Sequence, residues 1–580
     1  MTHSSSSRPA RPRATRWRLA AALPAFLYLT LLAACGGGGG GGADAPAEPP
    51  PPPVPVQPAD PVRPVGPVPV PGDATVRGRV TFDYVPSAGG RLAYAHVEAR
   101  PVRGARLQLV DEAGTVVADT RTDAEGRYSA QAPEGRPVRL RVSAELLAGN
   151  ARTRVTDNTQ GDALYALESP AFTGGGTRDL HAPSGWTGAG YRQPRSAAPF
   201  AVLDTVYRTQ AALLAVDPRA ALRPLDVHWS PGNRAVRGDK SQGQIGGTHF
   251  TAAAADTTAH IYVMGDEDVN TDEYDEGVIA HEWGHYYQWA FSRSDSPGGR
   301  HAGEPLELAL AFSEGWGSAW SGIALGIAAI SDAMGPGQAS GWFLPLDRAV
   351  TKRPGAHAED SVATVIWNFA RQRGVVPVHA AMRQLAASPA FNTLYAFSHA
   401  VRGADPDAAD ALDVLLEGQA IVTSRSSGDA YGTGETNDGG LQVLPPYLPL
   451  APGQSARVCS VSTYGKPNKL GNTRYLKVVT HRAGHYKLAI LGRDRGDGSR
   501  PRVELSWLDG VERTYGWTDT PGLDVDLPLP AGTLVLSLAD RDVLRGSYAT
   551  GCFDVQLVEL AEPPAASSYA APSFTPLRAR

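Results

Sequence analysis

Two histidines and a glutamate stand close together near the middle of this 580-residue chain. The segment reads His281-Glu282-Trp283-Gly284-His285. Residues four positions apart lie on the same face of an α-helix, so His281 and His285 can bind one metal ion together. Glu282 lies between them, where a zinc-dependent hydrolase places its general base. The pattern therefore predicts a helix that carries zinc ligands.

A catalytic zinc site of this kind needs a third protein ligand. Glu314 lies in a segment of mostly small and apolar residues, 311–320. A buried carboxylate without a partner is costly, so we expect Glu314 to bind the same ion. Two histidines, one glutamate and an open fourth position are typical of catalytic zinc rather than structural zinc. The alternative is a partly buried helix whose histidines bond to the backbone.

The zinc helix must begin shortly before the motif. Thr271 or Asp272 can cap its N-terminus, and the acidic residues that follow suit the positive end of the helix dipole. Residues 278–280 are apolar or small and run into the motif without a proline. Elsewhere the periodicity predicts a helix over residues 199–215, strands at 225–229 and 260–264, and helices near 360–367 and 378–382.

The pairing of His-Glu-Trp-Gly-His with the later Glu-Gly-Trp at residues 314–316 resembles the gluzincin metallopeptidases, the thermolysin-type clan, and within it the fungalysin branch. The resemblance covers about residues 260–330. It implies an α+β zincin-like domain that hydrolyses peptide bonds in protein or peptide substrates. His281, His285 and Glu314 would be the zinc ligands of this domain, and Glu282 its general base.

One position departs from this resemblance. Such peptidases usually have an Asp four residues after the ligand Glu, bonded to a zinc histidine, and here that residue is Ser318. The departure favours an alternative function, a catalytically inactive zinc-binding lipoprotein that acts as a binding or scaffold module. The resemblance also implies a His or Tyr that donates to the oxyanion, and the sequence leaves four candidates open: His301, His357, His399 and Tyr431. It further implies that an edge strand, which we expect at 260–264, pairs with substrate.

Calcium is the second cofactor that the sequence indicates. Asp266, Asp268, Asn270 and Asp272 alternate as the oxygen ligands of a calcium loop do. The loop lacks the usual Gly at its sixth place and Glu at its twelfth, so these residues favour a solvated acidic loop over a calcium site.

The N-terminal segment predicts export. A basic, serine-rich start precedes an apolar stretch from 19 to 34, which is short for a membrane span and typical of a signal sequence. It ends Leu32-Ala33-Ala34-Cys35, which resembles the bacterial lipobox, so Cys35 is the expected lipidation site. We therefore expect residues 1–35 to be a lipoprotein signal, 36–73 to be a Gly/Pro-rich linker, and the protein to be anchored by lipid, at the outer membrane or cell surface.

Four further regions complete the predicted multidomain architecture. Short alternating strands indicate a β-sandwich at 74–144, which resembles the transthyretin-like, carboxypeptidase-regulatory-like module, and another at 441–560. The metallopeptidase domain occupies 145–440 between them, and 561–580 forms a disordered tail. In an oxidising compartment Cys459 and Cys552 should form a disulfide. The net charge of −5 gives no support for nucleic-acid binding.

Overall fold

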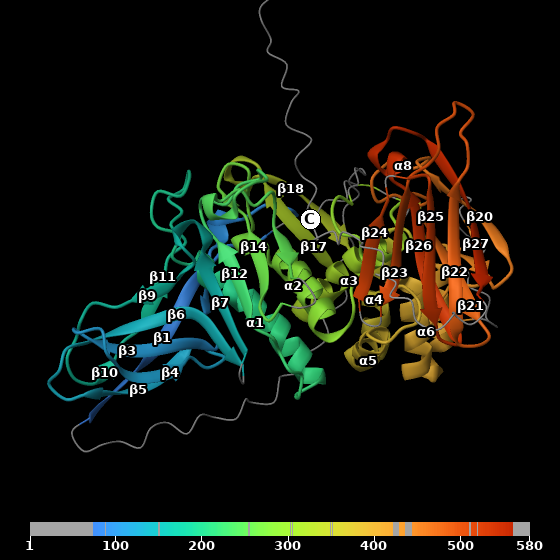
Figure 1. Ribbon diagram of the computed structural model, residues 1–580. Helices are drawn as coiled ribbons and strands as arrows, with labels where there is room; N and C mark the ends of the chain where they lie inside the picture. Colours follow the sequence, from blue (N-terminus) through green and yellow to red (C-terminus); the bar gives the residue numbers. More distant parts are fainter. Residues whose placement is uncertain are drawn as a thin grey trace, which may run out of the picture.

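The computed structural model describes residues 73–87, 89–148, 151–252, 256–301, 303, 305–348, 350, 352–421, 428–435, 444–509, 512–518 and 520–560. The predicted signal sequence with Cys35, nearly all of the linker and the tail at 561–580 lie outside these residues. The described residues form five separate β-sheets and eight α-helices in a multidomain arrangement (Figure 1). No described helix is long and apolar enough to cross a membrane.

Two sheets pack together at the N-terminal end of the molecule. The first is organised around the long strand β1, which pairs with each of the other four. Its strands are β1 (Asp73–Tyr84), β2 (Glu98–Pro101), β5 (Arg127–Pro133), β10 (Gly176–Thr177) and β11 (Leu180–Ala182). The second sheet contains β3 (Ala105–Asp111), β4 (Val116–Arg121), β6 (Val138–Ala148), β7 (Ala151–Asp157), β8 (Ala163–Leu164), β9 (Ala166–Glu168), β12 (Leu225–Trp229), β13 (His249–Thr251) and β14 (Ala259–Val263). Alternate residues of β3 and β5 are buried between the sheets, as a sandwich requires.

The predicted boundary between residues 144 and 145 is wrong. It falls inside β6, and the sheet continues from β6 through β7 and β12 to β14 and β13. The strands next to the predicted zinc helix therefore extend the sheet of the N-terminal sandwich, and both share one hydrophobic core. Figure 1 shows this sheet passing from the N-terminal strands toward helix α2 (Glu276–Phe291).

Helices fill the middle of the molecule. They are α1 (Ala198–Val216), α2 (Glu276–Phe291), α3 (Leu308–Leu325), α4 (Glu359–Arg373), α5 (Val375–Leu385), α6 (Leu394–Ala404) and α7 (Ala409–Glu417). The predicted helices in α1, α4 and α5 are confirmed. The predicted zinc helix, α2, begins later than expected, because Asp272–Tyr274 form a separate 3₁₀ turn and Asp275 precedes the helix. The aromatic residues of α2 at 283, 286 and 287 are buried core residues, and Trp283 and Tyr287 pack against tryptophans of α3.

A small four-stranded sheet lies beside the start of α2. It contains β15 (Gly265–Asp266), β16 (Asn270–Thr271), β17 (Ala329–Met334) and β18 (Ser340–Pro345). β16 leads directly into the 3₁₀ turn before α2, and β17 follows the end of α3. The sheet thus connects the start of α2 with the end of α3.

The C-terminal region forms a second sandwich with its own core. One sheet contains β19 (Tyr447–Leu450), β21 (Thr473–Thr480), β23 (Val503–Asp509), β24 (Glu512–Trp517) and β26 (Gly532–Asp540), and the other β20 (Ser455–Val461), β22 (Gly484–Gly492), β25 (Gly522–Leu529) and β27 (Thr550–Glu559). A short helix, α8 (Arg541–Arg545), follows β26. Cys459 and Cys552 face each other across β20 and β27 and are joined by a disulfide, the pairing expected from the sequence.

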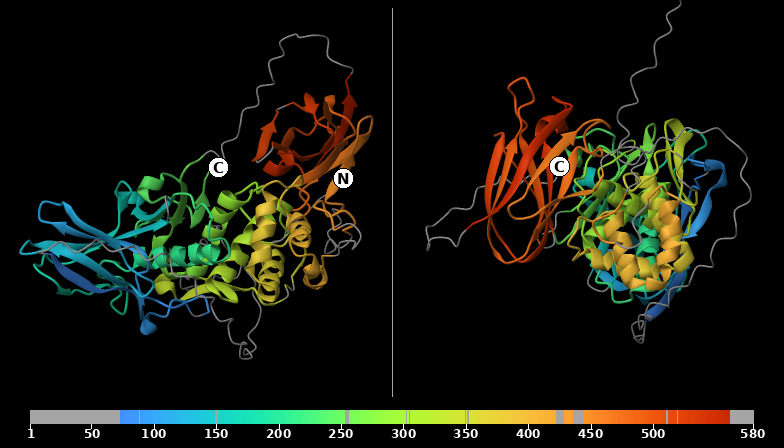
Figure 2. Two further views of the ribbon diagram at one scale, coloured as in Figure 1. Left: turned by 90° about the horizontal axis from the view of Figure 1, so that it is seen from below. Right: turned by 90° about the vertical axis from the view of Figure 1, so that its right-hand side faces the viewer.

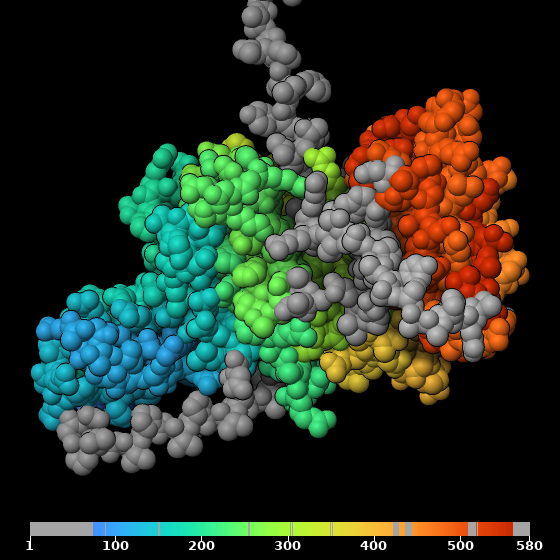
Figure 3. Space-filling model, in the orientation of Figure 1, coloured from blue at the N-terminus to red at the C-terminus, as the bar shows by residue number. Residues whose placement is uncertain are grey.

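The C-terminal sandwich contacts the helical region at the start of α3. The Tyr475 hydroxyl donates to the carboxylate of Glu307, whose other oxygen accepts from the Leu310 N–H and caps the helix. The Tyr475 ring also packs on Phe391, with centroids 4.9 Å apart. Figures 2 and 3 show this sandwich against the helical region, with the N-terminal strands at the opposite end. The sandwich therefore supports the helix that carries Glu314.

Candidate metal centre

Glycines allow α2 and α3 to approach closely at the predicted site. A Cβ atom added to Gly284 would lie 2.8 Å from the Cα of Gly317. A Cβ atom added to Gly317 would lie 2.9 Å from the ring of His281. Any larger side chain at either position would push the helices apart or displace the histidine. This contact explains Gly284 of His-Glu-Trp-Gly-His and Gly317 of Glu-Gly-Trp-Gly.

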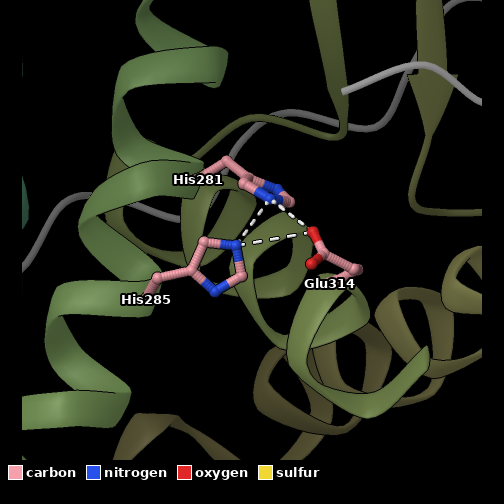
Figure 4. Close-up of side chains that lie close together, drawn as sticks. All are labelled: His281, His285 and Glu314. Atoms are coloured by element: carbon pink, nitrogen blue, oxygen red, sulfur yellow. Dashed lines mark hydrogen bonds and ion pairs between the residues drawn. The ribbon is translucent and has the colours of Figure 1, made fainter. Parts of the chain in front are cut away.

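The three predicted zinc ligands converge from these two helices (Figure 4). The Nε2 atoms of His281 and His285 are 3.1 Å apart. They lie 3.3 and 3.4 Å, respectively, from Oε2 of Glu314. His281 and Glu314 are buried and His285 is half-buried. The side chains therefore point at one another rather than at backbone groups or solvent.

These separations suit a single tetrahedral ion. Ligand atoms about 2.1 Å from one zinc in a tetrahedral arrangement lie about 3.4 Å from one another. The three observed distances are close to this value, and two imidazoles with one carboxylate form a donor set that zinc favours. The residues present thus fit a zinc ion with three protein ligands.

Two serine hydroxyls hold the ring nitrogens that do not face the ligand cluster. Ser318 Oγ lies 3.1 Å from His281 Nδ1, and Ser313 Oγ lies 3.4 Å from His285 Nδ1. Such partners orient a ligating histidine and determine which of its nitrogens is available to metal. Ser318 therefore makes the contact that the resemblance assigns to an Asp, with a neutral hydroxyl in place of a carboxylate.

Replacing Ser318 by Ala should lower zinc affinity by about 10- to 100-fold, because His281 loses the partner of its Nδ1. Competition with a zinc-binding dye would measure the change. Ser321→Ala is the matched control, since its hydroxyl lies one turn along α3 and donates to the Gly277 carbonyl instead. Equal zinc affinities for Ser318→Ala, Ser321→Ala and the unmodified protein would show that the contact does not hold His281 for metal.

Electrostatics keep Glu314 ionised although it is buried. Burial alone raises the pKa of the Glu314 carboxyl, but the charges of His301 and His285 and hydrogen bonds from His281 and His285 outweigh it, so the pKa lies well below its usual value. Burial lowers the pKa of His285, and Glu314 reverses the effect and raises it. Glu314 is therefore held as an anion beside the imidazole of His285.

A further histidine adjoins the cluster. His301 Nε2 lies 3.7 Å from Glu314 Oε2, and its Nδ1 lies 3.0 Å from Glu359 Oε2, at the start of α4. His301 is thus an oxyanion candidate that contacts a predicted ligand. His399 instead bonds to the Gly428 carbonyl. Glu359 was missed from the sequence because nothing local connects it with His301.

Glu282 faces the open edge of the large sheet. The edge strand is β13, which pairs with β14 on one side, so the expectation that residues 260–264 form the edge is wrong. The N–H of Phe250 in β13 donates to Glu282 Oε2 over 2.8 Å. Because successive backbone groups of a strand alternate in direction, this N–H points away from β14. The unpaired side of β13 thus faces the predicted general base.

The predicted calcium loop does not gather its four residues. Asp268 is exposed and Asp266 is half-buried, whereas Asn270 and Asp272 are buried. In the described part of the chain, Asp272 groups instead with Asp275 and Asp332. The alternating pattern therefore identified one member of an acidic cluster, but not the cluster itself.

Comparisons with known proteins add little. No known family matches the sequence, and no curated protein matches it. Among solved structures, the chain is similar to the pre-peptidase C-terminal domain of a collagenase from Bacillus anthracis, with 9% identity and a TM-score of 0.15. The match covers 19% of this chain and 93% of that domain. A likeness this weak carries no argument about function.

Proposed function

We propose that this protein is a zinc metallopeptidase with a zincin-like catalytic domain. The observation that carries the proposal is the convergence of His281, His285 and Glu314, with their Nε2 and Oε2 atoms 3.1–3.4 Å apart. These atoms come from two helices packed through glycines, so packing of the backbone holds the ligand cluster in place. Three protein ligands leave a fourth position for water or substrate.

Each residue has a defined task in this proposal. Bound zinc would act as a Lewis acid and lower the pKa of the attacking water. Glu282 accepts a proton from that water and passes it to the leaving amine. The Phe250 N–H donates a hydrogen bond to the Glu282 carboxylate and so fixes the orientation of this side chain. A peptide in extended conformation would add to the open side of β13, beside Glu282.

His301 supplies the donor for the developing oxyanion in this proposal. Its contact with Glu314 puts it beside the ligand cluster, and Glu359 fixes its orientation. His301→Gln should lower kcat by about 10²- to 10³-fold with KM nearly unchanged and full zinc content. His399→Gln, which changes an exposed histidine, is the control and should keep normal kcat. An unchanged kcat in His301→Gln would remove His301 from the mechanism.

The alternative, an inactive zinc-binding scaffold, was favoured by the Ser318 departure. That argument loses its force because the Ser318 hydroxyl contacts His281 where the family uses a carboxylate. Glu282 adds a point in favour of catalysis. Its carboxylate is directed at an open strand edge, a position that a purely structural zinc site does not require.

We further propose that the protein is exported and anchored by lipid on Cys35, with the folded body held away from the membrane by the linker. Cell fractionation of Cys35→Ala should find the protein released from the membrane fraction or held as unprocessed precursor. A correctly cleaved Cys35→Ala protein that stays with outer membranes would contradict the lipid anchor.

The proposed activity can be tested on an unfolded protein substrate. The mature chain, purified without chelator, is incubated with a reduced and alkylated protein, and new N-termini are identified by mass spectrometry. We expect cleavage that stops with a zinc chelator and resumes on addition of zinc. Zinc-loaded protein that leaves the substrate intact over many hours would contradict a general peptidase activity.

A further inference from the structure

We propose that Asp272, Asp275 and Asp332 bind a second cation, a hard, oxygen-ligated ion of the calcium type, that stabilises the start of the zinc helix. This inference does not depend on the proposed peptidase activity. It rests on a buried group of oxygen atoms outside the zinc site, from the 3₁₀ turn before α2, the residue that precedes α2, and strand β17.

The cluster is buried and compact. Asp272 and Asp275 are each 1% exposed and Asp332 is 4% exposed. One carboxylate oxygen from each lies within 4.8 Å of the others. Three carboxylates this close cannot all ionise in a protein interior unless a cation lies among them.

The recorded partners of the three carboxylates are neutral donors. The Thr248 hydroxyl donates to Asp272, and the Ala333 N–H donates to Asp275 over 3.0 Å. Asp332 accepts from the Asn270 amide and from the Trp342 indole. In the described part of the chain no lysine or arginine forms a recorded ion pair with them. Burial raises the pKa of all three carboxyls, that of Asp332 to about 7, and neighbouring acids add to the rise for Asp272 and Asp275.

Unpartnered oxygens are the second observation. One oxygen of Asp272 and one of Asp275 are buried without a hydrogen-bond partner. The amide of Asn270 lies in the cluster, since its Nδ2 is 3.3 Å from Asp332 Oδ1, and its own carbonyl oxygen is also buried and unpartnered. Because Asn270 carries no charge, its orphaned oxygen does not follow from repulsion among the acids. Carboxylate and amide oxygens are the ligands that calcium takes.

A cation here would join elements that the zinc site needs. Asp275 immediately precedes α2, which carries His281, and Asp332 lies on β17, which follows α3. Binding would neutralise the cluster and hold the two helices in register from the end opposite the C-terminal sandwich.

The test uses the mature full-length chain, loaded with zinc and freed of calcium. We expect its Tm to rise by about 5 °C when Ca²⁺ reaches a hundredfold excess over its Kd. Asp332→Asn should lose this response, and its Tm without Ca²⁺ should equal or exceed that of the unmodified protein, because one buried charge is gone. Asp268→Asn, which changes an exposed acid of the same loop, should respond normally.

A second measurement keeps the proposal testable if Asp332→Asn does not fold. Tb³⁺ bound at the cluster should luminesce on tryptophan excitation, because Trp342 bonds to Asp332. Ca²⁺ should displace Tb³⁺, and Glu314→Gln should leave the signal intact, which separates this site from the zinc centre. A Tm independent of Ca²⁺, together with no sensitised luminescence, would show that the carboxyls share protons instead, and would overturn the proposal.

Discussion

Glu282→Gln should bind zinc normally and hydrolyse peptides about 10³-fold more slowly, a loss of about 4 kcal/mol in transition-state stabilisation. The glutamine keeps the size of the side chain, and its carbonyl oxygen can still accept from the Phe250 N–H. Its amide cannot take a proton from water. The fold and the ligands should therefore persist while the proton transfer is lost.

Steady-state kinetics on a peptide substrate, combined with metal analysis of the same sample, would measure both properties. Glu276→Gln is the matched control, on the first turn of the same helix. That carboxylate pairs with Arg100 and Arg208, away from the ligand cluster, so kcat should stay within about twofold. If Glu282→Gln retained more than a tenth of the normal activity with full zinc, another group would have to be the base.

Glu314→Gln should lose zinc affinity by three orders of magnitude or more, because an amide oxygen replaces an anionic ligand. If the site binds zinc a thousandfold more weakly, zinc at saturating concentration adds up to about 4 kcal/mol less to the free energy of unfolding. The Tm of Glu314→Gln in zinc should therefore approach its own Tm in chelator, whereas the unmodified protein should show a large difference between the two conditions.

Glu359→Gln is the control for this experiment. Its carboxylate lies in the same region and contacts His301. It should bind one zinc with nearly normal affinity. Undiminished zinc affinity in Glu314→Gln would mean that the third ligand lies elsewhere, and His301 would be the first residue to consider, because its Nε2 is 3.7 Å from Glu314 Oε2.

Local patterns predicted the zinc helix because its geometry is set within five residues. The i, i+4 spacing of His281 and His285 puts them on one face of any helix. Glu314 was predicted as a ligand because burying a carboxylate costs free energy unless it binds a cation. These inferences required no knowledge of the tertiary fold.

Strand pairing was less predictable. Alternation identified β6, β12 and β14 as strands but carries no information on which strands become neighbours, so the continuous sheet across residue 144 was missed. The edge strand β13 has only three residues, too few for an alternation of apolar and polar residues to be recognised in the sequence. The acidic cluster was missed for a related reason, because Asp332 reaches Asp275 only through the small sheet that brings β17 beside the start of α2.

The most direct test of the central claim is a zinc titration of the chelator-treated protein with peptide hydrolysis as the readout. The account predicts no activity without zinc, a linear rise to one equivalent and a plateau beyond it. Glu282→Gln should take up the same single equivalent and stay inactive. Hydrolysis that is independent of zinc, or one bound equivalent that produces no hydrolysis in the unmodified protein, would contradict the assignment of His281, His285, Glu314 and Glu282 to a catalytic zinc centre.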